Sequence, residues 1–302
     1  MNVKIVFMGS PEFALPSLSG LIKNYDVIGV VTQPDRPAGR GKKLLSPPVK
    51  DLALEHRIPV IQPRRLKEEI ALEQLTQWNP DLIVVVAFGQ ILKQNVLDMP
   101  KYGCINVHAS LLPRWRGAAP IQASVYHGDT ESGVTIMKMD AGIDTGPILR
   151  QKKVNLRENE TAVSLGNRLS QLGAELLIDT LPGYLRGEII PQPQPENGAT
   201  YVSMIDKWDG LLDFSRPAFA LINQIRAYNP WPGTFFDIQN ERLKIHEAEL
   251  DFSDKLAVGE RGVVNGYPVI GTSEGNLLIR VIQPSGKKPM PGDVFLRGFR
   301  VW

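Results

Sequence analysis

The most apolar run of the chain is Leu82–Ala87, and it constrains the class of fold more than any other stretch. An uninterrupted apolar run of this length predicts a strand that is buried on both faces, because a half-exposed strand would alternate apolar and polar residues. Such strands belong to parallel sheets that are covered by helices on both sides. The run is far shorter than the ~20 residues with which an α-helix crosses a bilayer, and we expect no association with a membrane.

The start of the chain predicts the same architecture. Val3–Met8 is a compact apolar strand, Leu15–Ile22 carries apolar residues at helical spacing, and Asp26–Thr32 is a second buried strand. A strand, a helix and a strand in this order indicate a doubly wound, mostly parallel sheet of the Rossmann-like α/β class. The turn Gly9–Pro11 lacks the G-x-G-x-x-G spacing of a dinucleotide site, so we expect no nicotinamide cofactor.

Composition narrows the class of protein and the compartment in which it works. Hydrophobic residues make up 43% and charged residues 22% of the 302 positions, as in a soluble globular protein of two ordinary domains. A single cysteine excludes an internal disulfide and favours the cytoplasm, and from the strand-like run near the start we expect no leader peptide. The net charge of +2 neither favours nor excludes a nucleic-acid partner.

The periodic pattern is lost over Gly187–Thr200, where Pro191–Pro195 alternates proline and glutamine as an extended spacer. We therefore expect a catalytic domain over residues 1–187, a linker over 188–204 and a second domain over 205–302. The second domain begins with a helix, Ser215–Tyr228, and continues as short strands between glycine-rich turns. This pattern predicts a small antiparallel β-barrel.

Polar side chains gather where strands of the first domain end. Asn106 and His108 are two residues apart, so they share one face of an extended strand, and an irregular loop follows them. The next strand ends at a glycine-bearing turn flanked by Asp140 and Asp144. The carboxyl ends of strands in an open α/β sheet are where ligands bind, so this edge is the candidate site.

An amide, an imidazole and a carboxylate together can handle a carbonyl group. Asn106 and a protonated His108 can donate hydrogen bonds to an oxyanion, while Asp144 holds His108 and accepts a proton. The set suits transfer of an acyl group to an amine without a covalent enzyme intermediate. The G-x-S-x-G elbow of serine hydrolases is absent, and the four histidines lack metal-ligand spacing, so we expect no metal.

A basic, glycine-containing loop follows the second strand. It carries Arg36, Arg40, Lys42 and Lys43 but lacks the spacing of a phosphate-binding P-loop. Two interpretations stay open from the residues alone. The loop is either a solvated surface loop or a flexible arm that contacts phosphates.

The stretch Asn106–Gln122, NVHASLLPRWRGAAPIQ, resembles the signature of methionyl-tRNA formyltransferases. The segments Gly133–Met137 and Asp144–Gly146 are similar to its second half. The basic loop Pro34–Lys43 and the turn Arg226–Pro232 also resemble that family, so the likeness covers nearly the whole chain.

The resemblance implies a formyltransferase fold followed by a smaller OB-like β-barrel, and a role in translation initiation. The formyl donor would be 10-formyltetrahydrofolate, used as a co-substrate, and the acceptor the α-amino group of initiator methionyl-tRNA. Asn106, His108 and Asp144 would be catalytic. The implied folate-binding residues are Ser110, Leu111, Leu112, Pro113, Phe88, Gly89 and Asp140. The implied tRNA-binding residues are Arg36, Arg40, Lys42 and Lys43, and we expect a monomer.

Two other functions compete with this one. A formyltransferase for a small amine, such as an amino sugar nucleotide or a purine precursor, would need neither the basic loop nor the second domain. An RNA-binding module on an inactive α/β frame would not need Asn106, His108 and Asp144 together.

Overall fold

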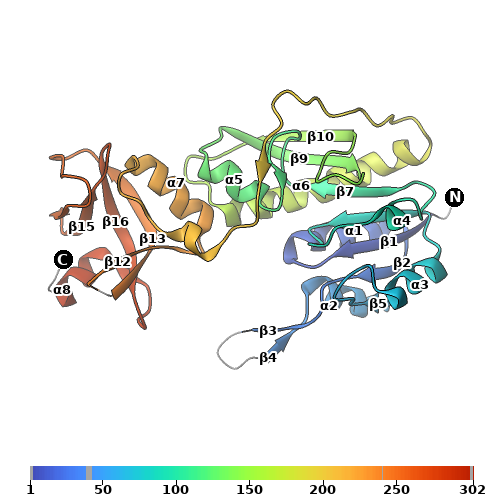
Figure 1. The fold of residues 1–302 in the computed structure, drawn as a ribbon, viewed down its shortest axis with the longest axis horizontal. Helices are drawn as coiled ribbons and strands as arrows, with labels where there is room; N and C mark the ends of the chain where they lie inside the picture. The colour runs from blue at the N-terminus through green and yellow to red at the C-terminus, as the bar shows by residue number, and fades with distance from the viewer. Residues whose placement is uncertain (1–2, 39–42, 240, 300–301) are drawn as a thin grey trace. The chain divides into compact units, whose positions relative to one another are not determined.

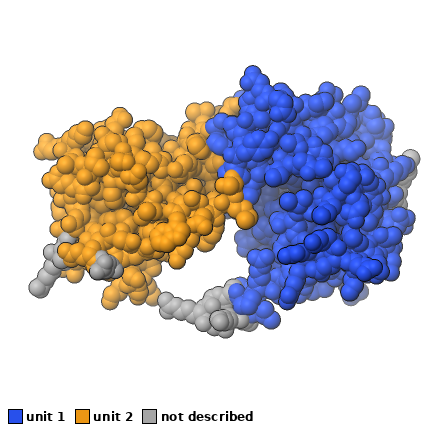
Figure 2. Space-filling view, viewed as in Figure 1, with its two compact units in different colours: residues 1–120, 132–154, 166–202 blue, residues 121–131, 155–165, 203–302 orange. Residues whose placement is uncertain are grey.

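The computed structural model describes residues 3–38, 43–239, 241–299 and 302. The chain forms two compact units, and neither is continuous in sequence. The first unit contains residues 1–120, 132–154 and 166–202, and the second contains residues 121–131, 155–165 and 203–302 (Figure 2). Among the described residues, no helix is both long and apolar enough to cross a membrane.

A seven-stranded sheet forms the centre of the first unit, in the order β10-β9-β7-β6-β1-β2-β5 (Figure 1). The strands are β1 (Lys4–Gly9), β2 (Asp26–Val31), β5 (Val60–Ile61), β6 (Leu82–Val86), β7 (Cys104–His108), β9 (Glu131–Lys138) and β10 (Ile148–Asn155). The pairs β1–β2, β1–β6, β2–β5 and β6–β7 are parallel, whereas β7 and β9 pair antiparallel. The predicted mostly parallel α/β sheet is confirmed, with the apolar run at its middle.

The helices between these strands begin with α1 (Leu15–Asn24), which follows the short 3-10 helix η1 (Glu12–Ala14). The others are α2 (Pro48–Glu55), α3 (Glu69–Trp78), α4 (Gln94–Leu97), α5 (Pro120–Tyr126) and α6 (Ala162–Leu185). Pro16 lies in the first turn of α1. A proline is tolerated there because the N–H that it lacks has no partner within the helix.

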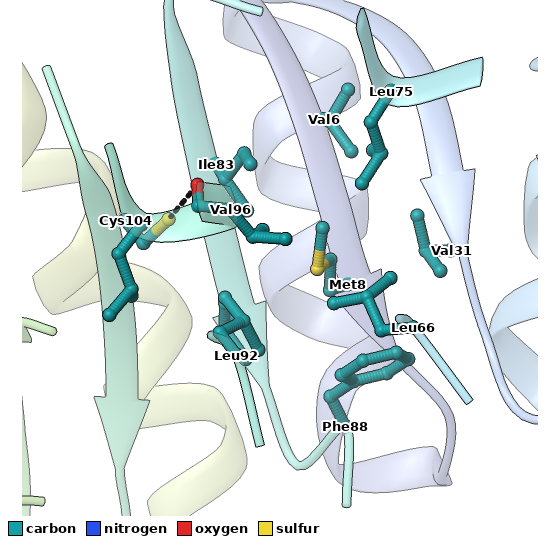
Figure 3. Close-up of a cluster of buried hydrophobic side chains, with 12 residues drawn as sticks. Val6, Met8, Val31, Leu66, Leu75, Ile83, Phe88, Leu92, Val96 and Cys104 are labelled. Atoms are coloured by element: carbon teal, nitrogen blue, oxygen red, sulfur yellow. Dashed lines mark hydrogen bonds between the residues drawn. The ribbon is translucent and has the colours of Figure 1, made fainter. Parts of the chain in front are cut away.

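Side chains at alternate strand positions cover the two faces of the sheet. Val6 and Met8 of β1 share one buried cluster with Ile83 of β6 and Leu75 of α3 (Figure 3). On the other face, α6 approaches β7 so closely that a Cβ added at Gly173 would lie 2.8 Å from a methyl group of Val107. The core therefore fixes which residues of β7 point to which face.

A two-stranded hairpin stands where the basic loop was expected. Its strands β3 (Arg36–Ala38) and β4 (Lys43–Leu45) pair antiparallel, with Arg36 opposite Leu45. Residues 39–42 at its tip lie outside the described part of the chain. The hairpin extends away from the sheet of the first unit (Figure 1).

Much of the stretch 188–204 packs within the first unit. Gln192 forms an isolated antiparallel bridge with Ile148. The short strand β11 (Tyr201–Val202) pairs parallel with β8 (Arg116–Gly117). The domain boundaries assigned from the sequence stay a prediction, but the extended stretch has defined partners.

The second unit is built on an antiparallel sheet in the order β12-β13-β16-β15-β14, with β17 paired to β16. Its strands are β12 (Thr234–Ile238), β13 (Glu241–Asp251), β14 (Arg261–Val264), β15 (Tyr267–Gly271), β16 (Asn276–Pro284) and β17 (Met290–Pro291). Its helices are η2 (Lys207–Gly210), α7 (Ala218–Tyr228) and α8 (Gly292–Gly298). Leu221 and Ile225 of α7 pack with strand residues such as Leu243 in its core. The antiparallel second domain is confirmed.

Helix α5 contributes its Tyr126 to the second unit. The Tyr126 ring stacks on Tyr228 of α7 with 5.4 Å between ring centroids. The Tyr126 hydroxyl accepts a hydrogen bond from Arg216 Nη1 at 2.8 Å. Burial raises the pKa of Tyr228 to about 12, so its phenol is neutral at physiological pH.

Candidate active site

Strand β7 delivers two polar side chains to one face of the sheet. Cys104, Asn106 and His108 alternate with Ile105 and Val107 along the strand. Cys104 belongs to the core cluster of Figure 3, so Asn106 and His108 share its face. Both are nearly buried, with exposed fractions of 9% and 5%. Buried polar side chains require partners, and both of these have them.

Asp144 is the partner that Asn106 and His108 share. Its Oδ1 accepts a hydrogen bond from Asn106 Nδ2 at 3.3 Å, and its Oδ2 lies 3.6 Å from His108 Nδ1. The backbone N–H of Gly117 donates to the same Oδ2 at 2.9 Å. The three residues predicted to be catalytic therefore converge on one carboxylate.

Asp144 adopts an unusual backbone conformation, with φ at +51°. This left-handed region is unfavourable for residues other than glycine, although aspartate and asparagine tolerate it best. Such conformations cluster at functional sites and persist where neighbouring contacts hold them. The conformation directs the Asp144 carboxylate back toward β7.

The far nitrogen of the His108 ring is anchored to the backbone. His108 Nε2 lies 3.0 Å from the carbonyl oxygen of Trp115. A carbonyl oxygen can only accept, so Nε2 carries a proton in this hydrogen bond. The anchor fixes the ring plane and leaves Nδ1 as the nitrogen that faces Asp144.

The loop after β7 is held rigidly by two residues of neighbouring strands. Thr135 Oγ1 donates to the carbonyl of Ser110 at 2.6 Å and accepts from the N–H of Leu112 at 3.1 Å. Gln151 Nε2 donates to the carbonyl of Leu112 at 2.8 Å. Ser110 Oγ in turn donates to the Arg114 carbonyl at 2.6 Å. The loop Ser110–Pro113 is therefore a fixed wall beside the three polar side chains.

The other residues expected to bind folate have structural partners as well. Phe88 packs its ring into the core cluster (Figure 3), and its carbonyl accepts from Gln33 Nε2 at 3.0 Å. Gly89, which follows, has φ at +75°. Asp140 is exposed, and its Oδ1 accepts from the N–H of Gly142 at 3.1 Å and from Thr145 Oγ1 at 2.7 Å. Asp140 thus shapes the turn that carries Asp144, and its role in folate binding stays a prediction.

Two of the four residues expected to bind tRNA lie on the strands of the hairpin. Arg36 is exposed on β3 and donates to Gln33 Oε1 at 3.2 Å, and Lys43 begins β4. Arg40 and Lys42 lie outside the described residues. Among the described side chains, that of Arg36 makes no hydrogen bond or ion pair with Asp144, and the role of all four residues in binding tRNA stays a prediction.

The base of the hairpin is anchored by Asp35. Its carboxylate accepts from Gln62 Nε2 at 2.7 Å and pairs with Lys50 Nζ at 2.7 Å. The hydrogen bond from Gln62, and then that from Lys50, lower the pKa of Asp35. The hairpin therefore begins from a fixed point at the carboxyl end of β2.

Several residues of the site have a role that their residue type does not reveal. They act through hydrogen bonds whose partners are far away in sequence: Gly117, Thr135, Gln151 and Gln194. The alternation of Gln192 and Gln194 in the proline-rich stretch is the one available signal, since period two indicates an extended chain with two distinct sides. Within the described ranges, no group of three or more His, Cys, Asp or Glu side chains could hold a metal ion.

The fold and the site together define a class of enzyme that handles a carbonyl with an amide, an imidazole and a carboxylate. The family model described as formyl transferase matches residues 3–181. The model described as formyl transferase, C-terminal domain, matches residues 204–300. The chain belongs to the formyl transferase family.

Relatives with assigned functions match over nearly the full chain. A methionyl-tRNA formyltransferase of Myxococcus xanthus is 45% identical, covering 99% of this chain and 96% of its own length. A methionyl-tRNA formyltransferase of Pelobacter propionicus is 48% identical, covering 97% of this chain and 92% of its own. The resemblance drawn from the motifs is therefore confirmed at the level of the whole chain.

Solved structures share the fold at lower identity. An N-formyltransferase from Helicobacter canadensis, in complex with folinic acid and dTDP-3-aminofucose, aligns with a TM-score of 0.70 and 23% identity. It covers 92% of this chain and 98% of its own. The sugar 3N-formyl transferase WlaRD, solved in the presence of dTDP and 5-N-formyl-THF, has a TM-score of 0.69 and 22% identity, covering 95% of this chain and 100% of its own. These likenesses establish the fold alone.

Proposed function

We propose that the chain transfers the formyl group of 10-formyltetrahydrofolate to the α-amino group of methionine on initiator methionyl-tRNA, giving the N-formylated tRNA that starts translation. The convergence of Asn106, His108 and Asp144 carries the proposal, since it supplies what a formyl transfer needs at one point. The acceptor follows from the methionyl-tRNA formyltransferases that match 97–99% of the chain at 45–48% identity.

Formyl transfer requires hydrogen-bond donors that stabilise the negative charge developing on the formyl oxygen. When a neutral amine attacks the formyl carbon, the formyl oxygen gains charge as the new C–N bond forms. Asn106 Nδ2 and a protonated His108 Nδ1 would donate to that oxygen, which is the largest single contribution that such sites make. Both nitrogens already face the same acceptor, the Asp144 carboxylate.

The reaction also moves one proton. The attacking amine loses it, and the folate nitrogen gains it as the old C–N bond breaks, so the atoms balance without a covalent enzyme intermediate. Asp144 would accept the proton through a water molecule and return it to the leaving nitrogen. The N–H of Gly117 keeps the carboxylate in place throughout.

For the folate pocket we propose the wall Ser110–Pro113 together with Phe88, Gly89 and Asp140. The support is the rigidity of that wall and the position of Phe88 and Gly89 directly after β6, at the carboxyl ends of the parallel strands. Asp140 shapes the turn that carries Asp144, through hydrogen bonds from Gly142 and Thr145. The hydrogen bonds that already hold Ser110–Pro113 reduce the cost of ordering this loop when folate binds.

For the tRNA we propose contacts from the hairpin residues Arg36, Arg40, Lys42 and Lys43 and from the second domain. Arg36 is exposed on a strand that extends away from the sheet, where a phosphate can reach it. We further propose a monomer in the cytoplasm. The monomer is supported by the origin of all three catalytic residues in one chain, and the compartment by the single, buried, free cysteine.

The test is a formylation assay with purified protein. It combines 10-formyltetrahydrofolate with charged initiator tRNA, and the controls are uncharged initiator tRNA, charged elongator tRNA and a small amino sugar nucleotide. Formyl groups should appear on methionine only when the initiator tRNA is charged. Equal or faster formylation of the amino sugar nucleotide would contradict the proposed acceptor, and no formylation of any amine would contradict the proposed reaction.

A further inference from the structure

The stretch from Gln192 to Val202, here called the return segment, contacts the turn that carries Asp144 and the strand β8. Gln192 begins it by exchanging two backbone hydrogen bonds with Ile148, at 2.7 and 2.8 Å. Val202 ends it as part of β11, paired with β8. Both ends of the return segment are thus fixed to the first unit, and Gln194 lies between them.

Gln194 binds the backbone of the turn that presents Asp144. Its Nε2 donates to the carbonyl of Asp144 at 2.8 Å and to the carbonyl of Gly146 at 2.7 Å. Its Oε1 accepts from Arg116 Nε at 3.1 Å. Two carbonyls require the amide nitrogen and a guanidinium requires the amide oxygen, so these three partners fix the orientation of the amide.

Arg116 explains why Gln194 is fixed. Its side chain is among the largest fully buried ones, with 1% exposure. Nη1 donates to the Tyr201 hydroxyl at 2.9 Å, and Nη2 lies 3.8 Å from Glu196 Oε1 with no hydrogen-bond partner of its own. A buried guanidinium is unfavourable unless it is paired, and the partners of this one belong to the return segment. Arg116 therefore holds the return segment in place.

The return segment reaches the Asp144 carboxylate by a second route. In the pairing of β8 with β11, Arg116 N donates to Thr200 O at 2.8 Å and Ala118 N to Val202 O at 3.0 Å. Gly117 lies between them, and its N–H points away to Asp144 Oδ2. A Cβ at Gly117 would lie 2.1 Å from Val202 O, so glycine is required for this approach.

We propose that Gln194, held by Arg116, is a positioning residue for Asp144 in formyl transfer. The inference rests on the proposed function through the role of Asp144. Asp144 is in a left-handed conformation that needs support, and Gln194 supports the carbonyls at positions 144 and 146. Without it the carboxylate would drift from Asn106 and His108, whose contacts with it are long enough to be lost on a small movement.

The first experiment compares two substitutions at one position. Gln194→Ala removes the whole amide, whereas Gln194→Glu keeps an oxygen for Arg116 but cannot donate to the two carbonyls. Both should lower kcat about 10–100-fold, because a small misplacement of a catalytic group has effects of that size. KM for folate and for tRNA should stay within about twofold, since Gln194 contacts neither in this proposal.

Gln192→Ala is the matched control. Gln192 has the same residue type in the same segment, is exposed, and donates its side-chain N–H only to the carbonyl of Ile190 at 3.2 Å. It should keep the kcat of the unsubstituted enzyme. If Gln194→Ala does not fold, Gln194→Glu carries the comparison, and a wild-type kcat for either folded variant overturns the inference.

The second experiment separates positioning from a merely structural role. Gln194→Ala is combined with Asp144→Asn, and the rates are measured in single turnovers at high enzyme concentration. If Gln194 acts through Asp144, Gln194→Ala should lower the single-turnover rate by less than about twofold when Asp144→Asn is already present. If Gln194 has only a structural role, Gln194→Ala should lower the rate by the same factor with and without Asp144→Asn. Equal reductions of the rate in the two backgrounds would overturn the inference about Gln194 and would leave the proposed function intact. A wild-type rate for Asp144→Asn by itself would instead overturn the proposed function.

Discussion

His108 can serve the reaction because its two ring nitrogens have separate tasks. Nε2 is bound to the Trp115 carbonyl, and Nδ1 faces the Asp144 carboxylate. The hydrogen bond to Trp115 therefore decides which nitrogen is available for catalysis. It also explains why the ring is nearly buried although it belongs to a reacting site.

His108→Ala should lower kcat about 10²–10⁴-fold, because it removes one donor to the developing oxyanion. The measurement is the steady-state rate of formylation with both substrates saturating. His56→Ala is a suitable control, since His56 is exposed at the end of α2. A rate within twofold of the unsubstituted enzyme for His108→Ala would refute its assignment.

Cys104 should be inert toward thiol reagents in the folded protein. Burial raises the pKa of its thiol to about 12, and its Sγ lies 3.7 Å from the carbonyl of Val96 in the core (Figure 3). At pH 8.5, roughly one thiol in three thousand would be ionised at such a pKa, against about half of ordinary thiols. Labelling by iodoacetamide should therefore be negligible in buffer and complete in concentrated urea.

The same labelling experiment has a defined pH dependence. Below its pKa a thiol becomes about tenfold more ionised with each pH unit, so the labelling rate of the native protein should keep rising above pH 9, where the rate of an ordinary thiol levels off. A labelling rate that levels off above pH 9 in the folded protein, as for an ordinary exposed thiol, would contradict the burial of Cys104.

At the scale of single residues, the sequence predicts which side chains form the site better than it predicts which backbone groups do. Asn106, His108 and Asp144 could be assigned because strand periodicity and the ends of parallel strands place them together. The N–H of Gly117 could not, because every residue except proline carries such a group, and only the pairing of β8 with β11 directs this one at Asp144. Gln194 could not be assigned for another reason: its side chain binds the carbonyls of Asp144 and Gly146, which are far away in sequence.

The hairpin is the element on which the tRNA proposal depends. Its strands place Arg36 and Lys43 near the two ends of a short antiparallel pair, and Asp35 fixes its base. An anchored hairpin can present positive charges at less entropic cost than a free loop. The sequence alone left a solvated loop and a phosphate-binding arm open.

Arg40→Ala should weaken the binding of initiator tRNA and reduce its dependence on salt. Each lost phosphate contact lowers the slope of log K against log salt concentration by about 0.7–0.9. The measurement is tRNA binding at several salt concentrations, with Lys23→Ala, an exposed charge on α1, as the control. Unchanged affinity and slope for Arg40→Ala would remove this residue from the tRNA-binding set.

Elements were predictable where local pattern decides them. The strands β1, β2 and β6 are apolar runs, and they lie within one or two residues of their expected bounds. The hairpin strands β3 and β4 have three residues each and include a proline, so no pattern marked them. The antiparallel direction of β9 against β7 also has no local signal, since direction depends on how the intervening chain returns.

At the scale of the whole molecule, the second unit is assembled from three separate parts of the sequence. Two short segments come from the first half of the chain or just after it, and the largest comes from its last third. Residues 121–131 and 155–165 belong to it together with 203–302. Composition and proline content predict a boundary where the chain looks like a linker, but they cannot show which earlier segments pack with the later ones. The stacking of Tyr126 on Tyr228 is one such contact.

Tyr126→Ala should lower the free energy of unfolding by about 2–4 kcal/mol, because it removes a stacked ring and the acceptor of Arg216. Tyr126→Phe is the matched control, since it keeps the ring and loses only the hydrogen bond, at about 1 kcal/mol. Urea denaturation measures both. Equal stability of the alanine variant and the unsubstituted protein would show that residues 121–131 are not needed by the second unit.

The discontinuity of the second unit also bears on the order of events during synthesis. Residues 121–131 and 155–165 leave the ribosome well before residues 203–302, with which they pack. At the usual rate of translation that interval is on the order of ten seconds. During it, Tyr126 has neither Tyr228 to stack on nor Arg216 to bind, so these contacts of the second unit can form only after the later part of the chain has been made.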